Sequence, residues 1–211
     1  MELPFDVRAA DRTIASSDEV MARIIDAYGP CEMTIIPVQS PFEALFKSII
    51  YQQLSTQSAT AIYNRVLALF DEGTPSARLT LTLTDEDLRG AGMSRQKIAY
   101  MRDLAAKSVE GIVPALKELK QLSDGEILDR LTAVHGIGRW TVEMLLMFSM
   151  GRPDILPSTD LGIRKGFQRV YEHENLPKPR EIEKHGERWR PYRTIASWYL
   201  WRVVDGDNEA W

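Results

Sequence analysis

The sequence predicts an all-α protein, and three observations support this fold class. Apolar residues recur every three or four positions over most of the 211-residue chain, which is the spacing of one helix face. Several of these stretches begin with residues that cap a helix. Only residues 79–83 alternate as a strand would, and this short segment has no obvious second segment with which to pair.

The first clear helix begins at the sequence Ser-Pro-Phe-Glu, residues 40–43. Serine caps a helix N-terminus, proline suits the first helical position, and a glutamate three residues after the cap can bond back to it. Apolar side chains follow at helical spacing: Phe42, Leu45, Phe46, Ile49 and Ile50. The turn Gln-Gln-Leu-Ser at residues 52–55 should separate this helix from a second one, which we expect Ser55 to cap.

Similar start signals occur further along the chain, at residues 84–87, at Ser94 and at residues 123–126. Residues 139–150 are apolar on almost every side, which is typical of a helix buried in the centre of a fold. The helix that begins at residues 123–126 is therefore followed closely by a buried one.

Two more helices are predicted in the last third of the chain, one over residues 159–171 and one that Pro191 opens. The best candidates for linkers are residues 71–84 and 175–180. Residues 1–37 are expected to pack beside the later helices rather than to stand alone.

The composition excludes several classes of site and location. Cys31 is the single cysteine, so the chain cannot form an internal disulfide, a four-thiolate zinc site or a four-cysteine iron-sulfur cluster. The first residues carry charges where a signal peptide needs an apolar run, and no 18-residue apolar stretch occurs. We therefore expect a soluble protein without a membrane partner, located in the cytoplasm, or in the nucleus if the source is eukaryotic.

The net charge of -4 argues against a protein that holds nucleic acid mainly through bulk positive charge. The charge is unevenly distributed, however. Residues 160–204 contain ten Lys or Arg and six Asp or Glu, which gives this stretch a local charge of +4. A solvated helical surface is the simpler interpretation of that count.

The sequence Gly-Ile-Gly at residues 136–138 lies between two predicted helices. We expect both glycines to stand where the backbone needs a positive φ or approaches another group closely. The helix that follows would direct its first N–H groups outward, and with the positive end of the helix dipole they form a site for an anion such as a DNA phosphate. A tight turn without a ligand is the alternative for the tripeptide alone.

Several motifs follow this hairpin in order. Residues 135–141 are His-Gly-Ile-Gly-Arg-Trp-Thr, a buried helix comes next, and residues 155–166 are Ile-Leu-Pro-Ser-Thr-Asp-Leu-Gly-Ile-Arg-Lys-Gly. This arrangement resembles the helix-hairpin-helix, the Gly/Pro-rich loop and the aspartate of the DNA glycosylase superfamily named for these features. The closest likeness is to the 3-methyladenine DNA glycosylase II branch, which repairs alkylation damage. It extends over about residues 40–201 and includes the turn 52–55 and the segment 188–193.

The resemblance implies a two-lobed helical fold with the active site in the cleft between the lobes. The whole chain, residues 1–211, would form this one glycosylase domain, with the helix-hairpin-helix motif at residues 123–150. Many members of this branch carry an additional N-terminal β-domain. Only about 39 residues precede Ser40, so we expect the compact form without that domain.

The resemblance places the catalytic aspartate of the family at Asp160. Cleavage of an N-glycosidic bond leaves positive charge on the sugar, and a fixed carboxylate stabilises that cation and can orient the attacking water. An alkylated base such as 3-methyladenine is already cationic and departs readily, so a second group acting as general acid is not required. An ordinary helix cap is the alternative role of this residue.

The resemblance also assigns groups of the hairpin to ligands. The amides of Gly136 and Gly138, with Thr141 nearby, would contact a DNA phosphate. The carbonyls of Thr132, Val134 and Gly136 match positions that hold a monovalent cation in relatives, so a structural Na⁺ or K⁺ is possible there and no other cofactor is expected.

The base pocket of this family is aromatic. Trp140 and Trp201 match its positions and would stack on an electron-poor alkylated base through cation–π attraction of about 0.5 to 2 kcal/mol each. Packing in the core is the alternative for both. Met144 stands where better-known relatives carry a pocket tyrosine, which leaves the shape of the pocket open.

The turn at residues 52–55 matches the loop that inserts a side chain into the base stack after a base has been flipped out. The resemblance places Gln53 at the wedge position, or Leu54 if the match shifts by one residue, and the amide of Gln53 could bond to the orphaned base. Leu54 would only stack and is the alternative, while Ser55 completes the DNA-binding turn. A solvent-exposed glutamine at a helix end, without a role in DNA binding, is the alternative for Gln53.

Together these motifs imply a monofunctional DNA glycosylase. Such a hydrolase flips alkylated bases like 3-methyladenine and 7-methylguanine out of double-stranded DNA and cleaves their N-glycosidic bond in base excision repair. We expect it to act as a monomer. A bifunctional glycosylase and lyase would need a lysine nucleophile where Trp140 stands, and a module that binds DNA without catalysis would not need Asp160. Whether hypoxanthine or ethenoadenine is also a substrate stays open.

Overall fold

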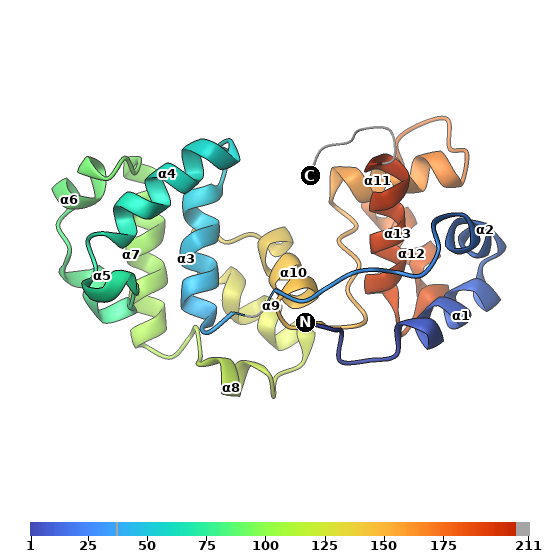
Figure 1. Cartoon of the computed structure of the whole chain (residues 1–211), viewed down its shortest axis with the longest axis horizontal. Coiled ribbons are helices and arrows are strands. Elements are labelled where there is room, and N and C mark those ends of the chain that lie inside the picture. Colours follow the sequence, from blue (N-terminus) through green and yellow to red (C-terminus); the bar gives the residue numbers. More distant parts are fainter. Residues whose placement is uncertain (37, 206–211) are drawn as a thin grey trace. The chain divides into compact units, whose positions relative to one another are not determined.

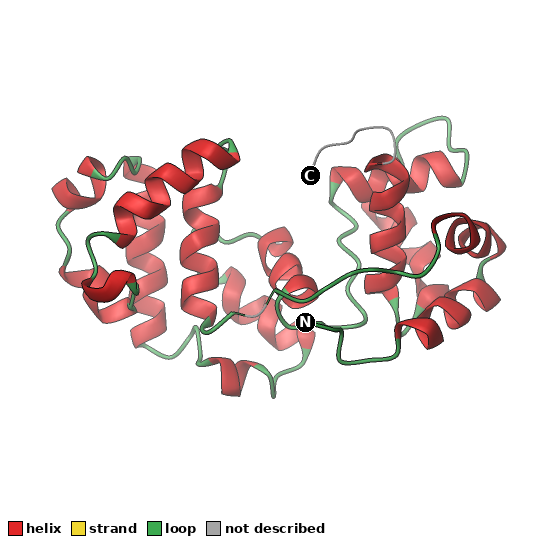
Figure 2. Cartoon of the chain, in the orientation of Figure 1, coloured by secondary structure: helices red, strands yellow, loops and turns green. Residues whose placement is uncertain are grey.

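The computed structural model describes residues 1–36 and 38–205. Within this part of the chain every regular element is a helix, as Figure 2 shows, so the all-α prediction is confirmed. The chain divides into two compact units. Unit 1 combines Met1–Pro37 with Glu143–Trp211, and unit 2 is Val38–Val142. No helix among the described residues is long and apolar enough to cross a lipid bilayer.

Unit 2 is built around a central helix, α7, which packs against α3 and α5 (Figure 1). The predicted apolar stripe of α7 is buried, with Ile98, Met101 and Leu104 at most 3% exposed. In chain order the elements of this unit are α3 (Pro41–Tyr51), α4 (Thr56–Leu67), the 3-10 helix η1 (Asp71–Gly73), α5 (Ala77–Thr82), α6 (Asp85–Gly90), α7 (Arg95–Val109), α8 (Leu116–Leu119) and α9 (Asp124–Thr132).

Side-chain caps begin these helices where the sequence predicts them. Ser40 accepts a backbone N–H from the first turn of α3 at 3.1 Å, and Ser55 and Ser94 cap α4 and α7 in the same way. Thr84 and Ser123 take part in complete capping boxes at α6 and α9. All five start signals are therefore confirmed.

The prediction that residues 71–84 form a linker is wrong. They contain η1 and α5, and α5 packs against α7 with Thr80 completely buried. The hydroxyl of Thr80 donates to the backbone oxygen of Ser76 at 2.8 Å, so this polar side chain is satisfied inside the unit. Arg102 of α7 donates to the backbone oxygens of Thr80, at 2.7 Å, and Leu83. Contacts with a distant helix thus support a segment whose own sequence alternates like a strand.

Unit 1 is built around its last helix, α13, which packs against α11, α1 and α2. The contacts of α1 and α2 with α13 confirm the prediction that the N-terminal segment packs beside the later helices. Helix α11 lies very near α13 at Gly166, where an added Cβ atom would come within 2.2 Å of the Leu200 backbone oxygen. The elements are α1 (Val7–Ser17), α2 (Glu19–Tyr28), α11 (Leu161–Val170), α12 (Pro179–Gly186), the 3-10 helix η2 (Glu187–Trp189) and α13 (Arg193–Asp205).

Some predicted helix boundaries shift. Helix α13 begins at Arg193 rather than at Pro191, and α11 begins at Leu161 because Asp160 is its cap. Helix α10 (Arg139–Phe148) begins in unit 2 and ends in unit 1. Its first two residues are exposed, so it is not buried on all sides as the apolar pattern predicts.

A buried carboxylate joins four segments of unit 1. Asp18 caps α2 with Oδ1, and its Oδ2 accepts hydrogen bonds from Tyr171, at 2.6 Å, and from His185 and Trp189, both at 2.9 Å. Burial alone would raise the pKa of Asp18, but the hydrogen bonds from these three side chains and from the start of α2 outweigh it and hold the pKa well below its usual range. This carboxylate therefore acts as a structural anchor.

Candidate functional site

The hairpin between α9 and α10 needs its first glycine but not its second. Gly136 has φ +86°, and a Cβ atom there would lie 2.2 Å from the ring of Tyr100. Gly138 lies outside the left-handed region, and a Cβ atom there would meet nothing within 4 Å. The expectation of a positive φ or a close approach is confirmed for Gly136. Gly138 has no positive φ and leaves open space beside the start of α10, so its close approach to a ligand stays a prediction.

Two side chains of α7 hold the hairpin in place. The carboxylate of Asp103 accepts the backbone N–H of His135 at 2.6 Å and the ammonium group of Lys107 at 2.6 Å. Burial would raise the pKa of Asp103, but these two hydrogen bonds outweigh it and lower the pKa. The ring of His135 packs edge-on against Tyr100 at a centroid distance of 4.7 Å. His135 therefore has a structural place in the hairpin.

The side chains of the described residues contain no group of three or more His, Cys, Asp and Glu arranged to hold a metal ion. Cys31 is buried, which raises the pKa of its thiol to about 12. Such a thiol stays protonated at neutral pH and is a poor nucleophile or metal ligand.

Two backbone carbonyls of the proposed cation site already accept one hydrogen bond each. The side-chain amide of Gln52 donates to the Gly136 oxygen at 2.8 Å, and the N–H of Ile137 donates to the Val134 oxygen at 3.0 Å. A carbonyl oxygen has two lone pairs, so a cation ligand remains chemically compatible with both. Thr132 lies at the C-terminal end of α9, where the helix dipole favours positive charge.

The turn at residues 52–55 presents its middle to solvent. Gln53, Leu54 and Ser55 are all exposed, and Gln53 has φ +56°, which is uncommon for a residue with a side chain. The ammonium group of Lys97 donates to the backbone oxygens of Ile50, at 2.6 Å, and Gln52, at 2.8 Å. The end of α3 and the beginning of the turn are thus fixed to α7.

The first turn of α10 is accessible. Trp140 is 48% exposed, Thr141 is half-buried, and Gly138 is exposed just before them. The first N–H groups of a helix point away from its body, and the dipole adds partial positive charge at this end. This region of unit 2 therefore has the character of an anion site.

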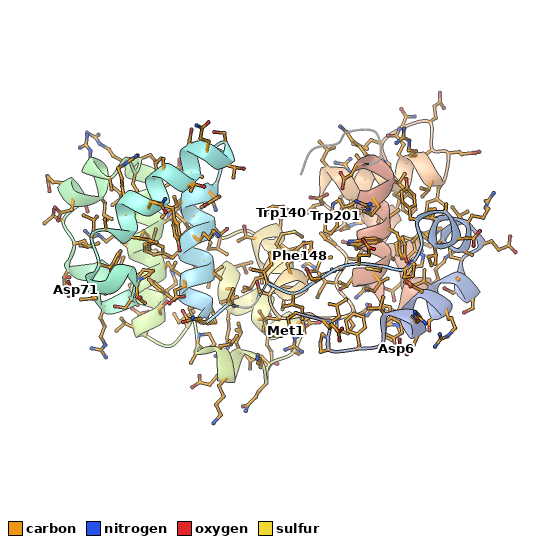
Figure 3. The ribbon with its side chains drawn as sticks, in the orientation of Figure 1. Met1, Asp6, Asp71, Trp140, Phe148 and Trp201 are labelled. Atoms are coloured by element: carbon orange, nitrogen blue, oxygen red, sulfur yellow. The ribbon has the colours of Figure 1, made fainter. Side chains whose placement is uncertain are left out.

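In unit 1, Asp160 is the N-cap of α11. Its Oδ1 atom accepts the backbone N–H of Ile163 at 2.9 Å and the indole N–H of Trp201 at 2.9 Å. The ring of Trp201 stacks on Phe148 with centroids 5.8 Å apart, and Figure 3 shows these two rings next to each other. At Gly162 a Cβ atom would come within 2.8 Å of the same indole ring. The carboxylate and the indole are thus held in one fixed arrangement.

The aromatic face of α10 includes one residue that the sequence did not single out for the site. Trp140, the half-buried Met144 and Phe148 are four residues apart, so they share one face of the helix. Phe148 contributes the ring that stacks on Trp201. Its spacing from Trp140 and Met144 is the signal by which it could have been found.

The structure therefore joins the predicted residues into two groups. In unit 2, the side chain of Gln52 links the turn to the hairpin at Gly136. In unit 1, Asp160 and Trp201 are directly bonded. The cleft expected between the lobes stays a prediction.

Comparison with known proteins adds to this picture. Residues 46–191 match the family of HhH-GPD superfamily base excision DNA repair proteins. A Schizosaccharomyces pombe protein named DNA-3-methyladenine glycosylase 1 is 34% identical over 204 residues, covering 96% of this chain and 90% of its own length.

Solved structures agree. A Bacillus halodurans DNA-3-methyladenine glycosidase has a TM-score of 0.86 at 34% identity, covering 95% of this chain and 91% of its own. The Schizosaccharomyces pombe 3-methyladenine DNA glycosylase Mag1, in complex with abasic DNA, has a TM-score of 0.75 at 34% identity, covering 92% of this chain and 95% of its own.

Proposed function

Because the chain belongs to the HhH-GPD superfamily of base excision DNA repair proteins, we propose that it excises alkylated bases from double-stranded DNA by hydrolysing their N-glycosidic bond. Cationic purines such as 3-methyladenine and 7-methylguanine are the proposed substrates. The observation that carries the proposal is the carboxylate of Asp160, fixed by the amide of Ile163 and the indole of Trp201. Relatives named for 3-methyladenine support the choice of substrate.

The proposed reaction breaks the bond between C1′ of the sugar and the nitrogen of the base. The electron pair of this bond leaves with the cationic base, which departs neutral, and positive charge develops on the sugar. The carboxylate of Asp160 stabilises that charge electrostatically. A water molecule then adds to C1′ through its oxygen and releases a proton to solvent, so atoms and charge balance.

Aromatic rings recognise the flipped base in this proposal. Trp201 lies next to the catalytic carboxylate, so a base that leaves from C1′ would pass its ring. Trp140 is exposed and supplies the second ring, and Met144 contributes a flexible apolar side chain in place of a tyrosine. Their attraction for positive charge would favour cationic bases.

The DNA backbone is held by the hairpin. The amides at Gly136 and Gly138 and the side chain of Thr141 are proposed to bind one phosphate, because open space beside Gly138 lets a phosphate approach. Gln53 is the proposed wedge, with Leu54 as the alternative, and the exposure of both side chains suits either. Ser55 caps α4 and is proposed to contact DNA beside the wedge.

A structural monovalent cation can bind at the same hairpin. The carbonyls of Thr132, Val134 and Gly136 supply the hard oxygen ligands that Na⁺ and K⁺ take. When bound, such an ion would add positive charge beside the phosphate. It takes no part in the bond cleavage proposed here.

The protein is further proposed to be a monofunctional monomer that acts in the compartment that holds the DNA. A lyase forms a Schiff base between a lysine and the sugar, and Trp140 stands at the position where such enzymes carry the lysine. Borohydride should therefore fail to trap the protein covalently on abasic DNA. Efficient trapping at a single lysine would show that the enzyme is bifunctional.

The test is a release assay with duplex DNA that contains 3-methyladenine or 7-methylguanine. Free base is separated by liquid chromatography and measured over time, with undamaged DNA and Asp160→Asn protein as controls. We expect release from alkylated DNA by the unaltered protein alone. Binding to these duplexes without any release would identify a non-catalytic DNA-binding module instead.

A further inference from the structure

Helix α7 presents one row of polar side chains to the two segments that we assign to DNA binding. Lys97, Tyr100 and Asp103 are three residues apart, so they lie along one side of the helix. Each contacts one of the two segments. Lys97 bonds to the turn at residues 52–55, whereas Tyr100 and Asp103 contact the hairpin.

Lys97 holds the turn through two backbone oxygens. Its ammonium group lies 2.6 Å from the oxygen of Ile50 and 2.8 Å from that of Gln52. These carbonyls are at the C-terminal end of α3, where the helix dipole favours a cation. Burial lowers the pKa of Lys97, so keeping a charge at this position has a cost.

The residue that follows the carbonyl held by Lys97 has an uncommon backbone conformation. Gln53 has φ +56° and an exposed side chain. A non-glycine residue keeps such a conformation only where its surroundings hold it there. The carbonyl of Gln52, fixed by Lys97, is part of the peptide group that sets this φ angle.

The turn and the hairpin are also joined directly. The side-chain amide of Gln52 donates to the oxygen of Gly136 at 2.8 Å. Gly136 in turn lies against the ring of Tyr100, and Asp103 holds the N–H of His135. Every link between the turn, the hairpin and α7 therefore lies within unit 2.

Water could satisfy the carbonyls at an exposed helix end, so hydrogen-bond satisfaction alone does not require a lysine there. The lysine adds a fixed position for the turn relative to the hairpin. We propose that Lys97 is a positioning residue for base flipping: it holds the turn so that its wedge enters the base stack while the hairpin holds the phosphate. This inference rests on the proposed function of the two segments.

The test compares Lys97→Met with Lys117→Met, which removes the same charge from an exposed position in α8. The rate of single-turnover excision is measured for the same lesion in two duplexes. In one duplex the lesion lies opposite its pairing partner, and in the other it lies opposite a mismatched base, where flipping requires less energy. We expect Lys97→Met to slow excision of the paired lesion by about tenfold or more, because even a small displacement of the wedge is costly. The rate of excision of the mismatched lesion should change far less. Lys97→Arg should restore most of the loss, and Lys117→Met should resemble the unaltered protein.

A second readout is the fluorescence of 2-aminopurine placed beside the lesion, which rises when the stack opens. We expect Lys97→Met to reduce this rise while still binding undamaged duplex. Equal losses on both substrates, or no loss on either, would overturn the inference. If Lys97→Met does not fold, Gln52→Leu removes the bond to Gly136 and should show the same selective loss.

The two proposals fail separately. If the unaltered protein releases no base, the proposed function is wrong, and the 2-aminopurine signal still reports whether Lys97 controls insertion of the wedge. If the unaltered protein releases base and folded Lys97→Met flips the paired lesion normally, only the inference about Lys97 is wrong.

Discussion

The indole N–H of Trp201 and the backbone N–H of Ile163 converge on the same oxygen of Asp160, each at 2.9 Å. The resemblance to the family implies a stacking role for this tryptophan through its ring face. The structure shows that its edge also holds the carboxylate. In the proposed reaction, Trp201 would therefore orient Asp160 in addition to any contact with the base.

Replacement of Trp201 by Phe separates these two roles. Phenylalanine keeps an aromatic face but lacks the N–H group, so the carboxylate of Asp160 loses the hydrogen bond from the indole. A hydrogen bond to a charged group contributes about 1.5 to 3 kcal/mol, so we expect excision to slow by roughly ten- to hundredfold for cationic and neutral lesions alike. Single-turnover rates with 7-methylguanine and hypoxanthine would check this. A loss confined to the cationic lesion would contradict the orienting role.

The variant Asp160→Asn tests the carboxylate itself. Asparagine can cap a helix as well as aspartate does, so α11 should still form and the thermal unfolding temperature should change little. Without the negative charge the sugar cation is not stabilised, and we expect excision to fall by at least about 100-fold. The rate of base release and the unfolding curve are the two measurements. Near-normal turnover would remove Asp160 from the mechanism.

The local sequence predicts much of this fold because helix starts are encoded locally. Ser40, Ser94 and Ser123 each bond within one turn of their own position, and the apolar residues that follow need only the helical period to find the core. Residues 71–84 do not follow this rule. Thr80 is buried against α7 and depends on Arg102, 22 residues away, which no local pattern reveals.

The candidate site shows the same contrast between features encoded locally and contacts between distant residues. The resemblance to a known family placed Asp160 and the hairpin, because their motifs are contiguous in the chain. The bond between Trp201 and Asp160 joins residues 41 positions apart, and Lys97 reaches Gln52 over 45 positions. Such supporting contacts form only when the chain folds. Sequence patterns therefore predicted the proposed functional residues but not the side chains that orient them.

The two glycines of the hairpin should respond differently to substitution. Gly136→Ala places a methyl group against the ring of Tyr100, and residues with a side chain rarely adopt the positive φ found at this position. We therefore expect the free energy of unfolding to fall by about 1 to 3 kcal/mol. Gly138→Val should leave stability nearly unchanged because a Cβ atom at this position meets no other atom within 4 Å. It should instead weaken binding to damaged and undamaged duplexes alike by blocking the phosphate. Denaturant unfolding and fluorescence anisotropy measure the two effects; unchanged affinity of folded Gly138→Val would make the hairpin purely structural.

The buried carboxylate of Asp18 should make stability depend on pH. Its pKa is lower in the folded state than the unfolded value of about 3.9, so its contribution is complete above that value and is lost as pH falls toward the folded pKa. We expect Asp18→Asn to lower the free energy of unfolding by about 2 kcal/mol or more at pH 7, because three side-chain donors lose a charged acceptor. The difference between the two proteins should shrink between about pH 5 and pH 3. Urea unfolding across this range would check it, and a constant difference would contradict it.

The last prediction concerns how the pocket selects its base. Trp140 is exposed at the start of α10, so its replacement by Leu should not disturb the core, and apolar bulk is largely kept. If the ring attracts positive charge, Trp140→Leu should slow excision of cationic 3-methyladenine or 7-methylguanine by roughly 2- to 30-fold, the equivalent of about 0.5 to 2 kcal/mol. A neutral lesion such as hypoxanthine should be affected less, which distinguishes this variant from Trp201→Phe. Equal losses for cationic and neutral lesions would indicate that pocket shape decides, and no loss at all would place the base away from Trp140.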